Sequence, residues 1–427
     1  MRAAIAAALA AVFLLVAAGC GSCTAATDQA GGDAAQLVPP SALAFVSADT
    51  NLDSAQWGTV KDLFGPIQLP KDLDYQRDVK PALGDELNVA VLGIDNGKPE
   101  AIAIVKPDDK AKLSKLAARF DQGNEHYTVE QIGDWSVVAD SAEAFQAVRT
   151  ASSGNSLADN ADHKSAASQL GGAALATAYA TGKGAQALPE KLRALVRAGG
   201  SPQWIAARLT ADNDGARIDA LESGATGPAA YKPTLLRDAP SGAIFAVSFK
   251  NVNELLARLQ SAQALGTALP PFVAQLKGIS GEGVLYVAPG ALLPVVTLEV
   301  RPQDPAAAAN SLRALASRIG NALSLHVTRE GAKVLLTNAA GNPGSGSLVD
   351  DQAFKDALAA ADVPDDVTWL AYADIPRLAP LIQAFAALAS NKDRKVTVRP
   401  NEKVGTVIAY GARTGATSRL VVRITHA

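Results

Sequence analysis

The sequence predicts an α+β fold made of two tandem similar units, each a mostly antiparallel sheet with helices packed on it. Three observations support this prediction. Segments of apolar strand pattern come in pairs around short turns, segments with helical spacing separate those pairs, and the second half of the chain repeats the order of the first. Because a hairpin forces its two strands to be antiparallel, we expect helices to cover one face of each sheet.

The composition is that of a globular protein large enough for more than one core. The chain has 427 residues, of which 48% are hydrophobic and 19% charged. This length suggests two or three domains, and the high apolar content excludes general disorder. The net charge of -3 arises from 39 basic and 42 acidic side chains. Since the two signs nearly cancel, we expect no nucleic-acid partner.

The two halves open with similar strands and continue with similar hairpins. The segment from Pro40 to Ser47 parallels Pro240 to Ser248, with one inserted residue. The first predicted hairpin joins Glu86–Ile94 to Ala101–Val105 through Asp95-Asn96-Gly97, and Asn-Gly is typical of a tight turn. Its counterpart joins residues 282–288 to residues 295–300. Both halves therefore predict the same strand and hairpin.

Each predicted hairpin leads into a helix. The sequence Lys106-Pro107-Asp108-Asp109 begins one helix, and Arg301-Pro302-Gln303-Asp304-Pro305 begins the other. Aspartate is favoured as an N-cap, and proline fits the first helical turn because its missing N–H needs no partner there. A second hairpin follows in residues 129–140 and again in residues 327–338. Helices capped by Ser156 and Ser347 are predicted next, before the final strands and hairpins.

These repeats define the predicted domain organisation. We expect a signal peptide in residues 1–19, a lipidated N-terminus and flexible tether in residues 20–38, a first α+β repeat in residues 39–227 and a second in residues 237–427. The boundary between the repeats falls near residues 224–238. The order of strands within each sheet does not follow from the sequence.

The N-terminus has the pattern of a secretory signal. Arg2 precedes an apolar run from Ala3 to Ala18, and small residues precede Cys20. This run is shorter than the roughly 20 residues that a membrane-spanning helix needs. The sequence Ala17-Ala18-Gly19-Cys20 is similar to bacterial lipoprotein signals, in which the cysteine becomes the lipidated first residue. The alternatives are lipidation at Cys23 and a cleaved secreted protein without lipid.

The resemblance extends beyond the signal. The Pro-Pro start followed by Ala42, Phe45 and Val46, with the repeated α+β pattern, resembles a family of bacterial surface lipoproteins whose repeated domain has no known function. This resemblance implies a protein anchored by lipid on the extracytoplasmic face of a cell membrane. It carries no catalytic residue over to this chain.

The histidines offer no metal-binding pattern. The chain has four, His126, His163, His326 and His426, and no two have the spacing of a zinc motif. His163 aligns with Phe354 of the second repeat, which favours a half-buried packing site over a metal ligand. The two cysteines lie at the N-terminus, so the body has no thiolate ligand or thiol nucleophile. We expect no metal and no cofactor.

Four other patterns have ordinary structural interpretations. Asp212-Asn213-Asp214-Gly215 lacks most of a calcium loop and predicts a hairpin turn. Thr181-Gly182-Lys183-Gly184 lacks the first glycine of a phosphate loop. Gly341–Ser347 predicts a loop, and the basic residues of 392–403 have no aromatic partners for nucleic acid. The four tryptophans, Trp57, Trp135, Trp204 and Trp369, fall in apolar segments and predict core packing.

The sequence therefore predicts a lipid-anchored extracytoplasmic protein that is not an enzyme and acts by binding or as an envelope component. The partner is the membrane, through lipid on Cys20; the ligand or protein partner is not identified. A cleft between the repeats is the expected place for a ligand. The alternatives are a carrier of an apolar ligand between the two repeats and a hydrolase whose site assembles only in three dimensions.

Overall fold

The computed structural model divides the chain into two compact units, Met1–Ala225 and Thr226–Ala427, which we call unit 1 and unit 2. It describes residues 33–67, 69–70, 72–95, 98–121, 126–187, 201–224, 227–251, 280–290, 294–319, 324–339, 345–381 and 402–427. The predicted signal peptide, Cys20 and Cys23 lie outside these residues. No helix in the described ranges is long and apolar enough to cross a membrane.

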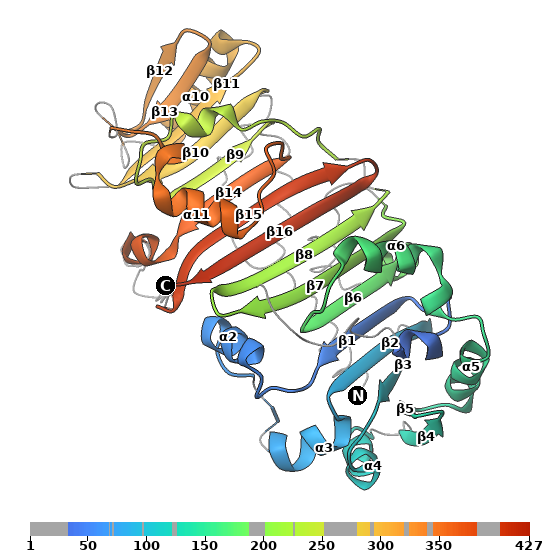
Figure 1. Cartoon of the computed structure of the whole chain (residues 1–427). Coiled ribbons are helices and arrows are strands. Elements are labelled where there is room, and N and C mark those ends of the chain that lie inside the picture. Colours follow the sequence, from blue (N-terminus) through green and yellow to red (C-terminus); the bar gives the residue numbers. More distant parts are fainter. Residues whose placement is uncertain are drawn as a thin grey trace. The chain divides into compact units, whose positions relative to one another are not determined.

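The described residues of unit 1 form eight strands, and each pair of neighbouring strands is antiparallel. They are β1 (Ala44–Asp49), β2 (Glu86–Asp95), β3 (Lys98–Val105), β4 (Thr128–Ile132), β5 (Trp135–Ala139), β6 (Ala176–Thr181), β7 (Trp204–Asp212) and β8 (Gly215–Ser223). Their order across the sheet is β4-β5-β3-β2-β1-β6-β7-β8 (Figure 1). The three predicted hairpins of this half are present as β2-β3, β4-β5 and β7-β8.

The described helical segments of unit 1 separate these strands. They are η1 (Ala34–Leu37), α2 (Ala55–Phe64), the π-helical turn η2 (Tyr75–Val79), α3 (Lys80–Leu83), α4 (Lys110–Ala118), α5 (Ala142–Ser152), η3 (Leu157–Asp159), α6 (Ala161–Leu170) and α7 (Gly182–Ala187). Helices and antiparallel strands together confirm the predicted α+β class.

Helices pack on both faces of the unit 1 sheet, so the expectation of one covered face was wrong. Alternate strand residues enter two separate cores, with Phe45 in one and its neighbours Ala44 and Val46 in the other. The first core includes Phe145 of α5, and the second includes Leu113 of α4. The physical reason is that strands such as β5 are buried along their whole length, which leaves no face for solvent.

The part of unit 2 that the structure describes also forms eight strands with antiparallel neighbours. They are β9 (Phe245–Phe249), β10 (Glu282–Ala288), β11 (Val295–Arg301), β12 (His326–Glu330), β13 (Lys333–Thr337), β14 (Trp369–Asp374), β15 (Val404–Thr414) and β16 (Thr417–His426). Their order is β12-β13-β11-β10-β9-β14-β15-β16.

The described helical segments of unit 2 include η4 (Thr234–Arg237), α10 (Pro305–Ile319), η6 (Leu348–Asp350) and α11 (Gln352–Ala360), and residues 375–381 after β14 are also helical. Leu312 and Leu315 of α10 pack in one core, while Phe354 of α11 packs in another. The helices of this unit therefore also cover both faces of their sheet.

The folded body begins before the predicted end of the tether. Residues 34–38 were assigned to a flexible tether, yet Ala34, Ala35 and Val38 have no exposed surface and belong to a core of unit 1. The Val38 carbonyl also accepts a 2.7 Å hydrogen bond from the Leu157 backbone N–H. Small apolar residues suit a flexible linker by composition, but here they pack against η3 and α5.

The serines predicted to cap two helices do not do so. Ser156 and Ser347 precede the short turns η3 and η6 without a capping hydrogen bond. Asn160 caps α6 and Asp351 caps α11, each accepting two backbone N–H bonds. The prediction of an Asp304 cap is confirmed, because its carboxylate accepts from the next two helical N–H groups.

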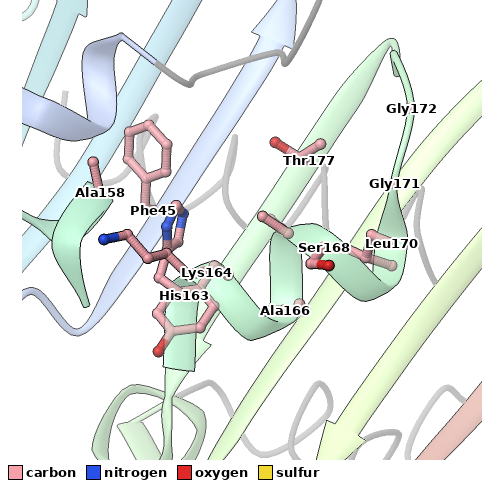
Figure 2. A pocket seen from close by; sticks show the side chains of 14 residues that line it. Phe45, Ala158, His163, Lys164, Ala166, Ser168, Leu170, Gly171, Gly172 and Thr177 are labelled. Atoms are coloured by element: carbon pink, nitrogen blue, oxygen red, sulfur yellow. The ribbon is translucent and has the colours of Figure 1, made fainter. Parts of the chain in front are cut away.

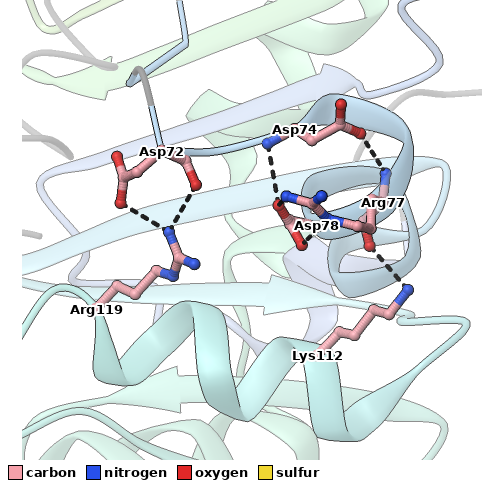
Figure 3. A network of polar contacts seen from close by, with 6 residues as sticks. All are labelled: Asp72, Asp74, Arg77, Asp78, Lys112 and Arg119. Carbon is pink, nitrogen blue, oxygen red and sulfur yellow. Dashed lines mark hydrogen bonds and ion pairs between the residues drawn. The ribbon is translucent and has the colours of Figure 1, made fainter.

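A polar network fixes the segment before α3 onto α4 (Figure 3). Arg119 forms an ion pair with Asp72 at 2.8 Å, and Lys112 donates to the Arg77 carbonyl at 2.8 Å. The hydrogen bond from the Arg77 guanidinium is the main cause that lowers the pKa of Asp78 to about 2. These groups are exposed or partly exposed to solvent, which screens their charges and keeps each pair weak. The network positions a surface segment.

Candidate functional site

A cavity of about 500 Å³ lies in unit 1, between α6 and the strands β1, β6 and β7. Figure 2 shows Phe45 and His163 near one end of it and Leu170 near the other. Thr177, Tyr179 and Ala206 contribute from the sheet. This volume is within the range of small-molecule sites, roughly 300 to 1,000 Å³.

Local sequence places α6 over this part of the sheet. The side chain of Asn160 accepts hydrogen bonds from the N–H groups of Asp162 and His163, which starts the helix. Ala166 and Leu170, four residues apart, face the core. The helix ends at Gly171, whose φ of 58° lies in the region that glycine adopts readily. Small residues along α6 leave space between the helix and the strands.

Three aromatic rings form one side of the cavity. The His163 ring lies 5.1 Å from the Tyr179 ring at 87°, and 6.2 Å from the Phe45 ring at 71°. Both pairs have the edge-to-face geometry that aromatic rings prefer. Burial lowers the pKa of His163 to about 4, so the imidazole is uncharged at neutral pH.

The Tyr179 hydroxyl is buried and has no hydrogen-bond partner in the part of the chain that the structure describes. The residue is only 4% exposed. Burial, followed by the nearby Asp162 carboxylate, raises the pKa of Tyr179 to about 12, so the hydroxyl keeps its proton at neutral pH. A buried hydroxyl without a partner costs about 1 to 3 kcal/mol. The hydroxyl of Tyr179 is thus a buried donor without an acceptor, and its oxygen has almost no surface open to the cavity.

A buried ion cluster supports the glycine end of the cavity. Arg208 and Arg217 each approach the fully buried Asp219 carboxylate at 3.1 Å. Arg208 also donates to the Gly171 carbonyl at the end of α6. These contacts occupy the Arg208 guanidinium. Arg208 therefore holds the turn between α6 and β6 in place.

The structure places the predicted histidine candidates apart. His126 lies 3.2 Å from the Asp121 carboxylate in an exposed loop, His326 begins β12, and His426 ends β16. His163 packs between two aromatic rings and is half-buried, which confirms the predicted packing site. The described residues contain no cluster of three or more His, Cys, Asp or Glu side chains able to hold a metal.

The other sequence candidates have structural positions. The Asp212 carboxylate accepts from the Asp214 N–H at 2.8 Å in the turn between β7 and β8, which confirms the hairpin prediction. Thr181 accepts from the Gly184 N–H at the start of α7. Trp57, Trp135 and Trp204 are buried, as predicted, and Trp369 is half-buried. Residues 341–344 and 392–401 lie outside the described residues.

Sequence reasoning missed Phe45, Thr177, Tyr179 and Ala206 as members of one site. These residues come from three strands, and the strand order had not been predicted. A usable signal is present in the sequence. Ala178-Tyr179-Ala180 recurs as Ala371-Tyr372-Ala373, and on the neighbouring strand Ala206 of unit 1 corresponds to the larger Ile408 of unit 2.

No protein-family model and no curated protein matches this chain. Among solved structures, a crystal structure of TP0453 (crystal form III) is similar to it at 10% sequence identity. The similarity covers 74% of this chain and 94% of that chain, with a TM-score of 0.21. A likeness this weak carries no argument about fold or function.

Proposed function

We propose that this protein is a lipid-anchored extracytoplasmic binding protein, without enzymatic activity, made of two copies of one α+β unit. The small residues before Cys20 and the apolar run that precedes them support the anchor. Lipid on Cys20 attaches the protein to the outer face of a cell membrane. Each CH₂ group of an acyl chain that enters the membrane contributes about 0.8 kcal/mol to the free energy of binding. Unit 1 then presents its binding cavity outside the cytoplasm.

Several matching features support the duplication. The strand orders of the two units correspond position by position when β1 is matched with β9. Leu157 donates its N–H to the Val38 carbonyl in unit 1, as Leu348 does to the Ala239 carbonyl in unit 2. The Phe354 and Tyr372 rings of unit 2 lie 5.1 Å apart at 88°, nearly the geometry of His163 and Tyr179.

The cavity of unit 1 is the observation that carries the binding proposal. Its apolar walls and few polar groups are typical of small-molecule sites, in which apolar surface supplies affinity and polar groups orient the ligand. A carrier role for an apolar ligand is the second candidate, because the same walls suit such cargo. Exchange of bound cargo with lipid vesicles distinguishes a carrier from a protein that only binds.

Mass spectrometry of the mature N-terminus tests the anchor. We expect a first residue Cys20 carrying acyl chains, and loss of both the lipid mass and membrane association in a Cys20→Ser variant. Cys23→Ser is the matched control and leaves the anchor in place. A mature protein without lipid, or with lipid on Cys23, contradicts the assignment of Cys20.

A further inference from the structure

We infer that the unit 1 cavity binds an uncharged, largely apolar aromatic molecule, and that unit 2 is a copy whose equivalent cavity is filled by larger side chains. This inference rests on the proposed binding function and specifies its ligand. It goes further by assigning the site to one unit only.

The sheet register identifies the residues that open the cavity. In unit 1, Tyr179 is paired with Ala206 across β6 and β7. In unit 2, Tyr372 is paired with Ile408 across β14 and β15. The isoleucine is fully buried in the core beside Phe354. Alanine at this position in unit 1 therefore leaves unfilled the volume that isoleucine fills in unit 2.

A second register pair gives the same contrast. Thr177 is paired with Ser47 in unit 1, and Leu370 is paired with Ser248 in unit 2. Thr177 lines the cavity, whereas Leu370 is 2% exposed and packs in the core. The change from leucine to threonine both removes apolar volume and adds a hydroxyl.

The helices differ in the same direction. Counted from their caps Asn160 and Asp351, His163 of α6 corresponds to Phe354 of α11. Ala167 corresponds to Leu358, and only the leucine packs against a hydrophobic core. On β1, Phe45 occupies the position that Ala246 has on β9 of unit 2. The larger Phe45 ring fills part of the space that the smaller residues of unit 1 leave open, and it forms an aromatic wall of the cavity. The result in unit 1 is a cavity with ring surfaces on one side.

The charges at the cavity favour an uncharged ligand. His163 is neutral at pH 7 because burial holds its pKa at about 4. Lys164, which lines the cavity, is exposed and lies 3.5 Å from the Asp159 carboxylate. Arg208 is not a lining residue and is engaged by Asp219 and the Gly171 carbonyl. An ion that left water for this site would lose its hydration without gaining a dedicated counter-charge from either group.

The Tyr179 hydroxyl is not a contact for the ligand, because its oxygen has almost no accessible surface. The neighbouring rings of His163 and Phe45 offer edges and faces to a flat aromatic body.

Two fluorescent naphthalene probes test this assignment on the purified full chain. Prodan is uncharged, while 6-dimethylamino-2-naphthoate has the same ring system with a carboxylate. We expect the full chain to bind prodan at least about tenfold more tightly than the naphthoate, a preference of about 1.4 kcal/mol. Equal binding of the two probes, or tighter binding of the naphthoate, overturns the uncharged ligand and leaves the binding function standing.

Substitutions that introduce the corresponding unit 2 side chains into unit 1 test whether the probe binds in the cavity. Thr177→Leu and Ala167→Leu, alone or together, are expected to weaken prodan binding by about tenfold or more, since they fill the cavity. Gln169→Leu adds a leucine to an exposed position of the same helix and is the matched control. If prodan binds the full chain no better than it binds the filled double variant, the proposed binding site itself fails.

Discussion

At the scale of single residues, the two tyrosines Tyr179 and Tyr410 represent opposite cases. The Tyr179 hydroxyl is buried without a partner in the described part of the chain, whereas the Tyr410 hydroxyl donates to the Asp362 carbonyl at 3.1 Å. The stability effect of removing a hydroxyl depends on whether a partner is then left without its bond. The same substitution is therefore expected to act in opposite directions at the two positions.

Tyr179→Phe is expected to raise the free energy of unfolding by about 1 kcal/mol, because it removes a buried donor that lacks an acceptor. Tyr410→Phe is expected to lower it by about 1 kcal/mol, because the Asp362 carbonyl loses its partner. Urea titration of both variants beside the unaltered chain measures the two changes. If Tyr179→Phe instead lowers the free energy of unfolding, the Tyr179 hydroxyl has a hydrogen-bond partner in the ligand-free protein.

His163 gives a pH dependence whose sign follows from its environment. Its pKa falls from the ordinary 6.5 to about 4 on folding, so the unfolded chain binds the proton more tightly. The stability from burying neutral imidazole is complete above about pH 6.5 and is lost as the pH falls toward 4. His163→Phe, which copies Phe354, is expected to remove this acid sensitivity.

The measurement compares urea midpoints at pH 7 and pH 5 for the unaltered chain, His163→Phe and His326→Gln. The unaltered chain and His326→Gln should lose more stability at pH 5 than His163→Phe, because His326 is exposed at the start of β12. Equal losses in all three proteins would show that the protonation of His163 does not depend on folding.

At the scale of helices, the capping residues show how short segments are fixed to the sheets. Asp351 caps α11 and also accepts from the Gly242 N–H at 3.0 Å, in the segment before β9. Asn160 caps α6 through the N–H groups of Asp162 and His163. Asp351 therefore starts α11 and also joins this helix to the segment before β9.

Alanine substitutions of the two caps are expected to differ in cost. Asn160→Ala should lower the free energy of unfolding by about 1 kcal/mol, and Asp351→Ala by about 2 kcal/mol, because Asp351 also loses its bonds outside the helix. Ser347→Ala, which leaves both caps in place, is the comparison and should cost less than Asp351→Ala. Chemical denaturation of the three variants tests this order.

At the scale of the whole molecule, the proposed duplication predicts matched responses in the two units. Gly84 has a φ of 70° and would place a Cβ against the Lys106 carbonyl. Gly281 has a φ of 97° and would place a Cβ against the Arg301 carbonyl. Both glycines stand just before corresponding strands, β2 and β10, where the backbones come close.

Gly84→Ala and Gly281→Ala are each expected to destabilise the protein by more than about 2 kcal/mol, because positive φ and close backbone contact both disfavour a side chain. Gly133→Ala is the control, since its φ of 61° is also positive but nothing lies within 4 Å of the added carbon. Its cost should be about 1 kcal/mol. Calorimetry of the three variants measures the changes, and a small effect at only one of Gly84 and Gly281 would argue against equivalent positions.

The sequence by itself determined the α+β class, the hairpins and the capped start of α10. Apolar alternation, a turn such as Asp212–Gly215, and Asp304 before Pro305 act over a few residues, so their outcome depends little on the rest of the chain. The same local reasoning failed at residues 34–38, whose small apolar side chains are buried only because other segments cover them.

Only the tertiary structure decided the strand order, the covering of both sheet faces and the cavity beside α6. These features depend on contacts between residues far apart in the chain, such as the pairing of Phe45 with Tyr179 and of Tyr179 with Ala206. Periodicity shows that a residue is buried, yet it does not show which residue lies opposite. Ala206 is important for the cavity because Tyr179 pairs with it across the sheet and the small side chains of α6 lie over this part of the sheet.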